Sequence, residues 1–189
     1  MPIIKFVNED NNKRYDTEDS IRNCIEYIFD VGKTFYDEVR TGHMCSDFVG
    51  CAHFMGTRCQ EIQPELVANQ MIINNFVYGK AKENLLKHRI ISFHNADSVM
   101  PNEAFDLAHY IAEIYGENYI TAYGVHMDTN QIHIHLAVDT IGWRDGKRFS
   151  FSFEKRWMTS LVNAWMDSRN YNLISNRKAN ETCERYYGY

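Results

Sequence analysis

The chain has 189 residues, of which 44% are hydrophobic and 24% are charged, and its formal net charge is −5. This length and composition predict one globular domain, residues 1–189, with a real hydrophobic core. No apolar run approaches the ~20 residues of a membrane span and the start lacks a secretory signal, so we expect a cytoplasmic protein without a membrane segment. The five cysteines are odd in number and include no Cys-x-x-Cys pair, which argues against a disulfide framework or a zinc ribbon.

The first half of the chain predicts one strand and three helices. Residues 16–20 contain capping residue types, and apolar residues follow them at helical spacing, so a helix should start there and end near Tyr27. The segments expected to be regular are a strand at residues 3–7, this helix, a helix from Asp47 towards Cys59, and a helix from Glu65 to Phe76.

The second half predicts strands joined by hairpins and interleaved with helices. Strands are expected at residues 87–93, 119–126, 132–138 and 172–174, and helices are expected to open at residues 98–101 and to span residues 154–168. Asp145-Gly146 is a turn signal, and it should join a strand that ends near Trp143 to a strand at residues 148–151. This order predicts an α+β fold, in which helices cover the apolar back of a mostly antiparallel sheet.

Three of the eight histidines, His126, His133 and His135, fall within ten residues of one another. Apolar residues alternate with His133 and His135, so these two share one face of a strand. Residues 128–131 are turn-forming types and predict a hairpin. If Thr129-Asn130 is a two-residue turn, His126 lies opposite His133 and all three imidazoles converge. A loop that shifted the register by one residue would send His126 to the other face.

Three convergent imidazoles predict a metal site, although the polar face of an amphipathic strand is the plainer alternative. Imidazole binds Zn, Mn, Fe, Ni and Cu, whereas Mg prefers oxygen, so these residue types alone favour a transition metal. A site with three protein ligands leaves positions open, and substrate oxygen atoms can then bind there.

The histidine motif resembles the metal motif of the relaxases. These are the mobilisation nucleases (MobP-like) of conjugative plasmids and transposons, within the HUH endonucleases. The similar residues are His126-x-Asp128, His133-x-His135 and then residues 145–149.

Two further stretches are similar to that family. In residues 24–34 a tyrosine stands near the end of a helix, just before a basic residue, and residues 88–93 resemble a strand that precedes a long helix. The chain departs from the family at residues 130–132, where relaxases often place an acidic residue or a histidine, sometimes followed by proline.

The resemblance implies an HUH relaxase-like fold and metal-dependent nicking of one DNA strand at a transfer origin. Tyr27 is then the expected nucleophile and stays joined to the 5′ phosphate, with Tyr15 and Tyr36 as alternatives. The three histidines hold a divalent ion, Mn²⁺ or Mg²⁺, or Zn²⁺, Ni²⁺ or Co²⁺ in vitro. Asp128 orients a ligand histidine or accepts a proton, unless it merely caps the turn.

The resemblance also implies that the chain binds single-stranded DNA at the hairpin and nick site of the transfer origin, together with other relaxosome or coupling proteins. The net negative charge argues against nucleic-acid binding, because phosphate contacts need clustered Lys and Arg. Basic residues do cluster locally, however. Those expected to contact DNA are Lys33, Arg58, Arg89 and Arg148.

Two other functions fit part of the pattern. A rolling-circle replication initiator shares the fold and chemistry, but its tyrosine usually follows the histidine pair, whereas Tyr27 precedes it. The second alternative function is that of a non-enzymatic interaction domain, in which the metal holds the fold together. The sequence shows no helicase or primase module, so the chain is either a minimal relaxase or an excised domain.

Overall fold

A five-stranded sheet forms the centre of the molecule. The structure is a computed structural model that describes residues 2–11, 13–34, 48–54, 62–80 and 83–174. Within these residues the strand order is β1-β3-β5-β4-β2, and each neighbouring pair is antiparallel. The strands are β1 (Ile3–Phe6), β2 (Val49–Ala52), β3 (Leu86–Ser92), β4 (Thr121–His126) and β5 (His133–Asp139). The predicted α+β fold with an antiparallel sheet is confirmed.

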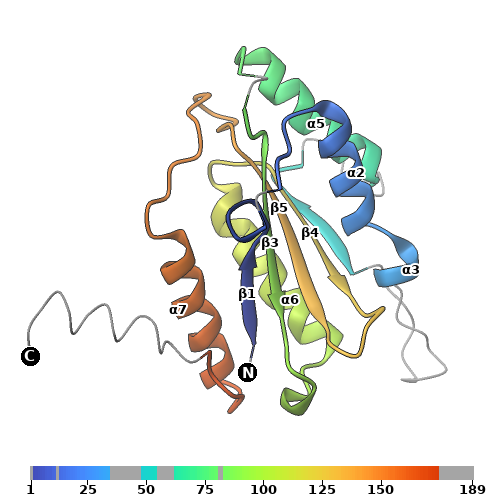
Figure 1. Cartoon of the computed structure of the whole chain (residues 1–189), viewed down its shortest axis with the longest axis vertical. Coiled ribbons are helices and arrows are strands. Elements are labelled where there is room, and N and C mark those ends of the chain that lie inside the picture. The colour runs from blue at the N-terminus through green and yellow to red at the C-terminus, as the bar shows by residue number, and fades with distance from the viewer. Residues whose placement is uncertain (1, 12, 35–47, 55–61, 81–82, 175–189) are drawn as a thin grey trace, which may run out of the picture.

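Helices cover both faces of this sheet (Figure 1). The described helices are α1 (Val7–Asp10), α2 (Glu18–Ile28), α3 (Val31–Thr34), α5 (Pro64–Val77), the 3₁₀ helix η1 (Asn95–Asp97), α6 (Pro101–Gly116) and α7 (Glu154–Asp167). Ile134, Leu136 and Val138 of β5 pack into a core with α6 and α7, and Ala137 packs into a second core with α2 and α5. The prediction that helices cover the apolar back of the sheet is confirmed by α6 and α7, and α2 and α5 cover part of the other face.

None of the described helices is long and apolar enough to cross a membrane.

Helix α2 forms where its capping residues predicted it. Thr17 caps the helix, because its side chain accepts a hydrogen bond from the Ser20 N–H and the Ser20 hydroxyl group accepts one from the Thr17 N–H. The apolar residues at helical spacing are buried on the face that packs against the sheet and α5. Tyr27, by contrast, is 41% exposed near the end of α2, at the edge of this packed face.

The hairpin of β4 and β5 has the register that brings the histidines together. His126 pairs with His133, and Gly124 pairs with His135. The connection spans residues 127–132 and is longer than the predicted two-residue turn, but it is lengthened equally on both sides. The register, and hence the face of each histidine, is therefore the predicted one.

The predicted helix from Asp47 towards Cys59 was wrong where the structure describes it. Residues Val49–Ala52 form the edge strand β2, which pairs with β4. Helical spacing of apolar residues is a weak signal over so short a segment, and pairing with the free edge of β4 overrides it. Residues 55–61 lie outside the described part of the chain.

Two predicted strand segments near the C-terminus were also wrong. The Asp145-Gly146 turn forms, but it joins segments linked by one isolated bridge, Ile141 to Arg148. Residues 172–174 form no strand, because the Ile174 backbone bonds to the Asn163 side chain at 2.7 Å (N–H to Oδ1) and 3.2 Å (C=O to Nδ2). Hydrogen bonds to a side chain of α7 replace strand pairing there.

Candidate metal centre

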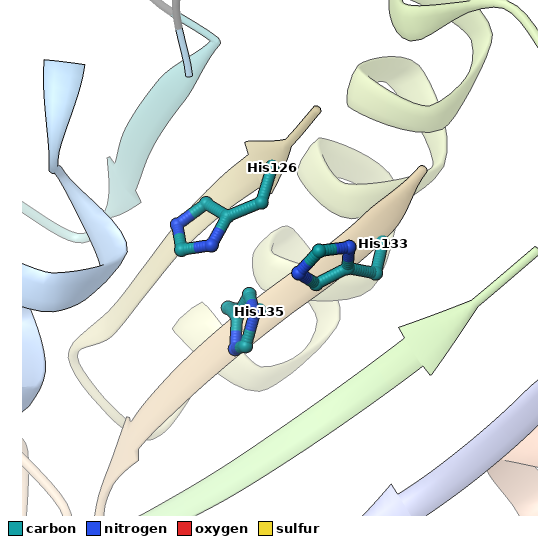
Figure 2. A group of neighbouring side chains, drawn as sticks. All are labelled: His126, His133 and His135. Atoms are coloured by element: carbon teal, nitrogen blue, oxygen red, sulfur yellow. The ribbon is translucent and has the colours of Figure 1, made fainter. Parts of the chain in front are cut away.

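His126, His133 and His135 meet on one face of the β4–β5 hairpin (Figure 2). One nitrogen atom from each ring lies within 4.8 Å of the others. The ring centres are 4.3 Å apart for His126 and His135, 5.0 Å for His133 and His135, and 5.3 Å for His126 and His133. The convergence expected from the two strand patterns and the hairpin register is therefore present.

Backbone carbonyl groups hold two of the three rings. Nε2 of His126 donates to the carbonyl oxygen of Ile28 at 3.1 Å, and Nδ1 of His133 donates to that of Gln131 at 2.9 Å. A carbonyl oxygen only accepts, so each bond places the ring proton on the named nitrogen. The lone pairs of His126 Nδ1 and His133 Nε2 are then free for a ligand.

The third ring, His135, is held by another histidine. Its Nδ1 lies 2.9 Å from Nε2 of His88 on β3. Its Nε2 is buried, as is Nδ1 of His126, and neither atom has a hydrogen-bond partner within the described residues. Buried polar atoms are normally satisfied, so two orphaned nitrogen atoms in one cluster point to a missing ligand.

Burial also favours the neutral form of two of these imidazoles, those of His126 and His135. Removal from water lowers the pKa of His126 and lowers that of His135 well below its usual value, and the neighbouring histidines add to both effects. The pKa of His88 falls to about 3, mainly for the same reason. A neutral imidazole with an unused lone pair is the form that binds a metal. The three histidines could therefore bind a metal ion.

Tyr27 stands beside this cluster. Its ring centre is 5.1 Å from that of His126 and 5.3 Å from that of His135. The ammonium nitrogen of Lys33 lies 4.0 Å from the centre of the Tyr27 ring and 3.5 Å from a carboxylate oxygen of Asp30. An exposed tyrosine, a lysine and the three histidines thus share one corner of the molecule.

The alternative tyrosines differ from Tyr27 in position. Tyr15 is only 2% exposed, its hydroxyl group lies 2.8 Å from Nδ1 of His88, and burial raises its pKa. A buried phenol that resists ionisation is poorly suited to attack DNA. Tyr36 lies outside the described residues.

Asp128 and Asp139, both near the histidines in the sequence, have different surroundings. An oxygen of Asp128 lies 3.9 Å from Nε2 of His133, the nitrogen that faces the cluster. Asp128 therefore does not hold the outer nitrogen of His133. Asp139 shares a strand face with His135, yet its carboxylate accepts hydrogen bonds from Asn74 and Asn75 of α5.

The basic residues expected to contact DNA are dispersed. Lys33 is at the cluster, and Arg58 lies outside the described residues. Arg148 is partly exposed, 3.6 Å from a carboxylate oxygen of Glu83. Arg89 is fully buried, and its guanidinium group pairs with Glu154 and Glu9. Arg89 is thus a structural residue rather than a DNA contact, and that expectation was wrong.

His88 is the residue that sequence reasoning missed. In the sequence it is one residue of the predicted strand at residues 87–93, between Lys87 and Arg89, yet it touches His135 from the neighbouring strand. The register of β3 and β5 pairs His88 with Ala137, so His88 lies diagonally across from His135 on the same face. Since β3 and β5 are far apart in sequence, only the strand order could reveal this contact.

A cavity of about 480 Å³ opens beside the cluster. It is lined by Tyr27, His88, His135 and Ile90, with polar side chains that include Lys13 and Asn23. A second cavity, of about 490 Å³, lies against α5 and is mainly apolar; none of the predicted site residues lines it. The first cavity is thus the one that bears on the histidine cluster.

Comparison with known proteins gives one family. The model of the family described as "Relaxase: MobA/VirD2-like, nuclease domain" matches residues 49–187, which is more than half of the chain. This range includes the three histidines and begins after Tyr27. No curated protein matches the chain. A solved structure described as "Molecular Basis of Vancomycin Resistance Transfer in Staphylococcus aureus" is similar with 17% sequence identity and a TM-score of 0.47, over 92% of this chain and 95% of that chain.

Proposed function

The chain belongs to the family of MobA/VirD2-like relaxases, and from this premise we propose that it nicks one DNA strand at the transfer origin of a conjugative or mobilisable element. The observation that supports this most directly is the group of three convergent histidines, two of which carry an orphaned buried nitrogen atom, beside an exposed tyrosine. The proposed substrate is single-stranded DNA, the proposed ligands are His126, His133 and His135, and the proposed nucleophile is Tyr27.

The proposed reaction exchanges one phosphodiester for another. The Tyr27 phenol loses its proton, and its oxygen attacks the scissile phosphorus. The bond from phosphorus to O3′ breaks, the released O3′ takes up a proton, and the 5′ side remains joined to Tyr27. His126, His133 and His135 would hold a divalent ion, Mn²⁺ or Mg²⁺, which would polarise the phosphate oxygens and offset their charge. Because the bonds exchanged are alike, the reverse step rejoins the strand.

The neighbours of Tyr27 have roles that this chemistry needs. The ammonium group of Lys33 lies over the ring, where its charge stabilises the negative charge of the attacking oxygen. Asp128 lies on the metal side of His133, so we assign it the role of proton acceptor rather than of ligand orienter. The 480 Å³ cavity gives an unpaired nucleotide room next to Tyr27.

Covalent trapping tests this proposal. Incubation with single-stranded oligonucleotides from a candidate origin and Mn²⁺ should yield a protein–DNA adduct on a denaturing gel, and peptide mapping should place it on Tyr27. Tyr27→Phe should retain DNA binding but form no detectable adduct, because phenylalanine has no oxygen to attack. The matched control is Tyr110→Phe, which changes an exposed tyrosine of α6 and should leave the adduct yield unchanged.

Two outcomes would change the assignment. An adduct that persists in Tyr27→Phe means that another tyrosine is the nucleophile. With an authentic origin and bound metal demonstrated, absence of any adduct favours a metal-stabilised binding domain instead.

Metal removal distinguishes a catalytic ion from a structural one. We expect a chelator to abolish the adduct while lowering the melting temperature by only a few degrees, because two apolar cores hold the sheet independently of the histidines. Thermal unfolding with and without chelator measures this. Collapse of the fold on chelation would contradict a catalytic role and support a structural one.

A further inference from the structure

A buried series of hydrogen-bonded side chains leads away from His135. Nδ1 of His135 lies 2.9 Å from Nε2 of His88, and Nδ1 of His88 lies 2.8 Å from the hydroxyl oxygen of Tyr15. Each of the three residues is at most 5% exposed. The thiol group of Cys24 on α2 raises the pKa of Tyr15 further, beyond the effect of burial. These hydrogen bonds therefore join β5, β3 and the segment before α2 within the core.

The partner of His135 differs in kind from those of the other two histidines. His126 and His133 face backbone carbonyl oxygens, which can only accept a proton, so their tautomers are decided locally. An imidazole partner can donate or accept. The tautomer of His135 therefore depends on which nitrogen of His88 carries the proton.

The hydrogen bonds that link Tyr15, His88 and His135 can run in only two directions. If Tyr15 donates to His88 and His88 donates to His135, then the remaining proton of His135 sits on Nε2 and no lone pair faces the cluster. In the opposite direction, His135 donates from Nδ1 to His88, His88 donates from Nδ1 to Tyr15, and the Tyr15 hydroxyl proton points away from His88. Only this second direction leaves a lone pair on the orphaned Nε2 of His135.

We propose that His88 and Tyr15 are positioning residues that hold His135 in the tautomer with a free Nε2 lone pair and so complete the metal centre. This inference rests on the metal site of the proposed function. It assigns no contact with DNA or with the ion to His88 or Tyr15. Their effect passes through the His135 ring.

Metal titration is the first test. Calorimetry with Mn²⁺ alone should show that His88→Leu binds the ion about 10- to 100-fold more weakly than the natural protein, because His135 Nδ1 loses its acceptor. His88→Gln should bind within a few fold of the natural protein, since its amide oxygen can accept from His135. Tyr15→Phe should weaken binding in the same direction but less.

The opposite face of the sheet offers a matched control. Nδ1 of His109 on α6 lies 2.8 Å from the hydroxyl group of Tyr123 on β4, a second histidine–tyrosine pair that does not touch the cluster. His109→Leu and Tyr123→Phe should leave the Mn²⁺ affinity unchanged. Equal weakening by these control variants and by His88→Leu would overturn the proposal, because it would show a general effect on the fold.

The tautomer itself can be observed without metal. Long-range ¹H–¹⁵N correlation spectra of the natural protein should show the His135 proton on Nδ1, and its signals should change in His88→Leu. A proton on Nε2 in the natural protein, or Mn²⁺ binding by His88→Leu at the natural affinity, would overturn the inference. If the natural protein binds no Mn²⁺, the proposed metal centre fails, and the tautomer still decides the role of His88.

Discussion

Tyr15 and Tyr27 lie near the same histidines in different surroundings. Tyr15 is enclosed and bonded to His88, whereas Tyr27 is exposed at the end of α2 under the ammonium group of Lys33. Both are tyrosines in the N-terminal part of the chain, and the sequence left both open as nucleophiles. Burial separates them, because an enclosed phenol resists ionisation, and this supports Tyr27 as the proposed nucleophile.

The buried carboxyl group of Asp139 predicts how the stability of the protein changes with pH. Burial raises its pKa to about 7, against an ordinary carboxyl pKa near ~3.9. Between about pH 4 and pH 7 the folded protein therefore holds a proton that the unfolded chain has released. The contribution of Asp139 to the free energy of unfolding then decreases as the pH rises through this window.

Asp139→Asn removes that contribution, since an amide does not titrate there. Melting temperatures measured from pH 4 to pH 8 should show the difference between variant and natural protein moving in favour of the variant as the pH rises. The difference between the two proteins is compared because His126 and His135 also make stability depend on pH. Their pKa values are lowered in the folded protein, so their contribution to the free energy of unfolding is lost as the pH falls, opposite to that of Asp139. A difference that does not vary with pH would contradict the prediction.

At the scale of elements, the packing of α2 on β4 determines the geometry of the candidate site. Gly124 faces α2, and a Cβ atom there would collide with the carbonyl oxygen of Ile28. That same oxygen accepts the hydrogen bond from His126. The missing side chain thus lets the end of α2 approach the strand, and this approach holds one proposed ligand and carries Tyr27 with it.

Gly124→Ala should therefore damage both the fold and the site. We expect the free energy of unfolding to fall by about 1–3 kcal/mol from overpacking, and Mn²⁺ to bind more weakly because Ile28 must move away from His126. Denaturant unfolding and calorimetry measure the two effects. Gly116→Ala is the control: its Cβ would meet the Cβ of Ala52 at 2.8 Å on the other face, so stability should fall without loss of metal affinity. Unchanged metal affinity in Gly124→Ala would contradict this role.

At the scale of the whole molecule, Arg89 joins elements that are distant in sequence. Two of its nitrogens donate to the Glu154 carboxylate at 2.8 Å, and a third donates to Glu9 at 2.9 Å. The Tyr115 hydroxyl group donates to the same Glu154 carboxylate at 2.7 Å. This network ties β3 to α1, α6 and α7, on the sheet face opposite the histidines.

Arg89→Met should lower the free energy of unfolding by about 3–5 kcal/mol, because it leaves the buried Glu154 carboxylate without its partner. The affinity of the folded protein for single-stranded DNA should not change. Chemical unfolding and fluorescence anisotropy with a labelled oligonucleotide separate the two effects. Weaker DNA binding at unchanged stability would restore Arg89 as a DNA contact.

The sequence by itself determined the local part of this protein: the capped helix that ends near Tyr27, the hairpin, and the shared face of His126, His133 and His135. The helix follows from apolar residues that recur every 3.6 residues, and the shared face follows from strands that alternate every two residues and from one turn. Each of these patterns lies within a short stretch of chain. Tertiary structure alone decided the edge strand β2, the burial of Arg89, and the contacts of His88 with His135 and Tyr15. Those depend on strand order and on helix packing between segments far apart in sequence, which no local pattern encodes.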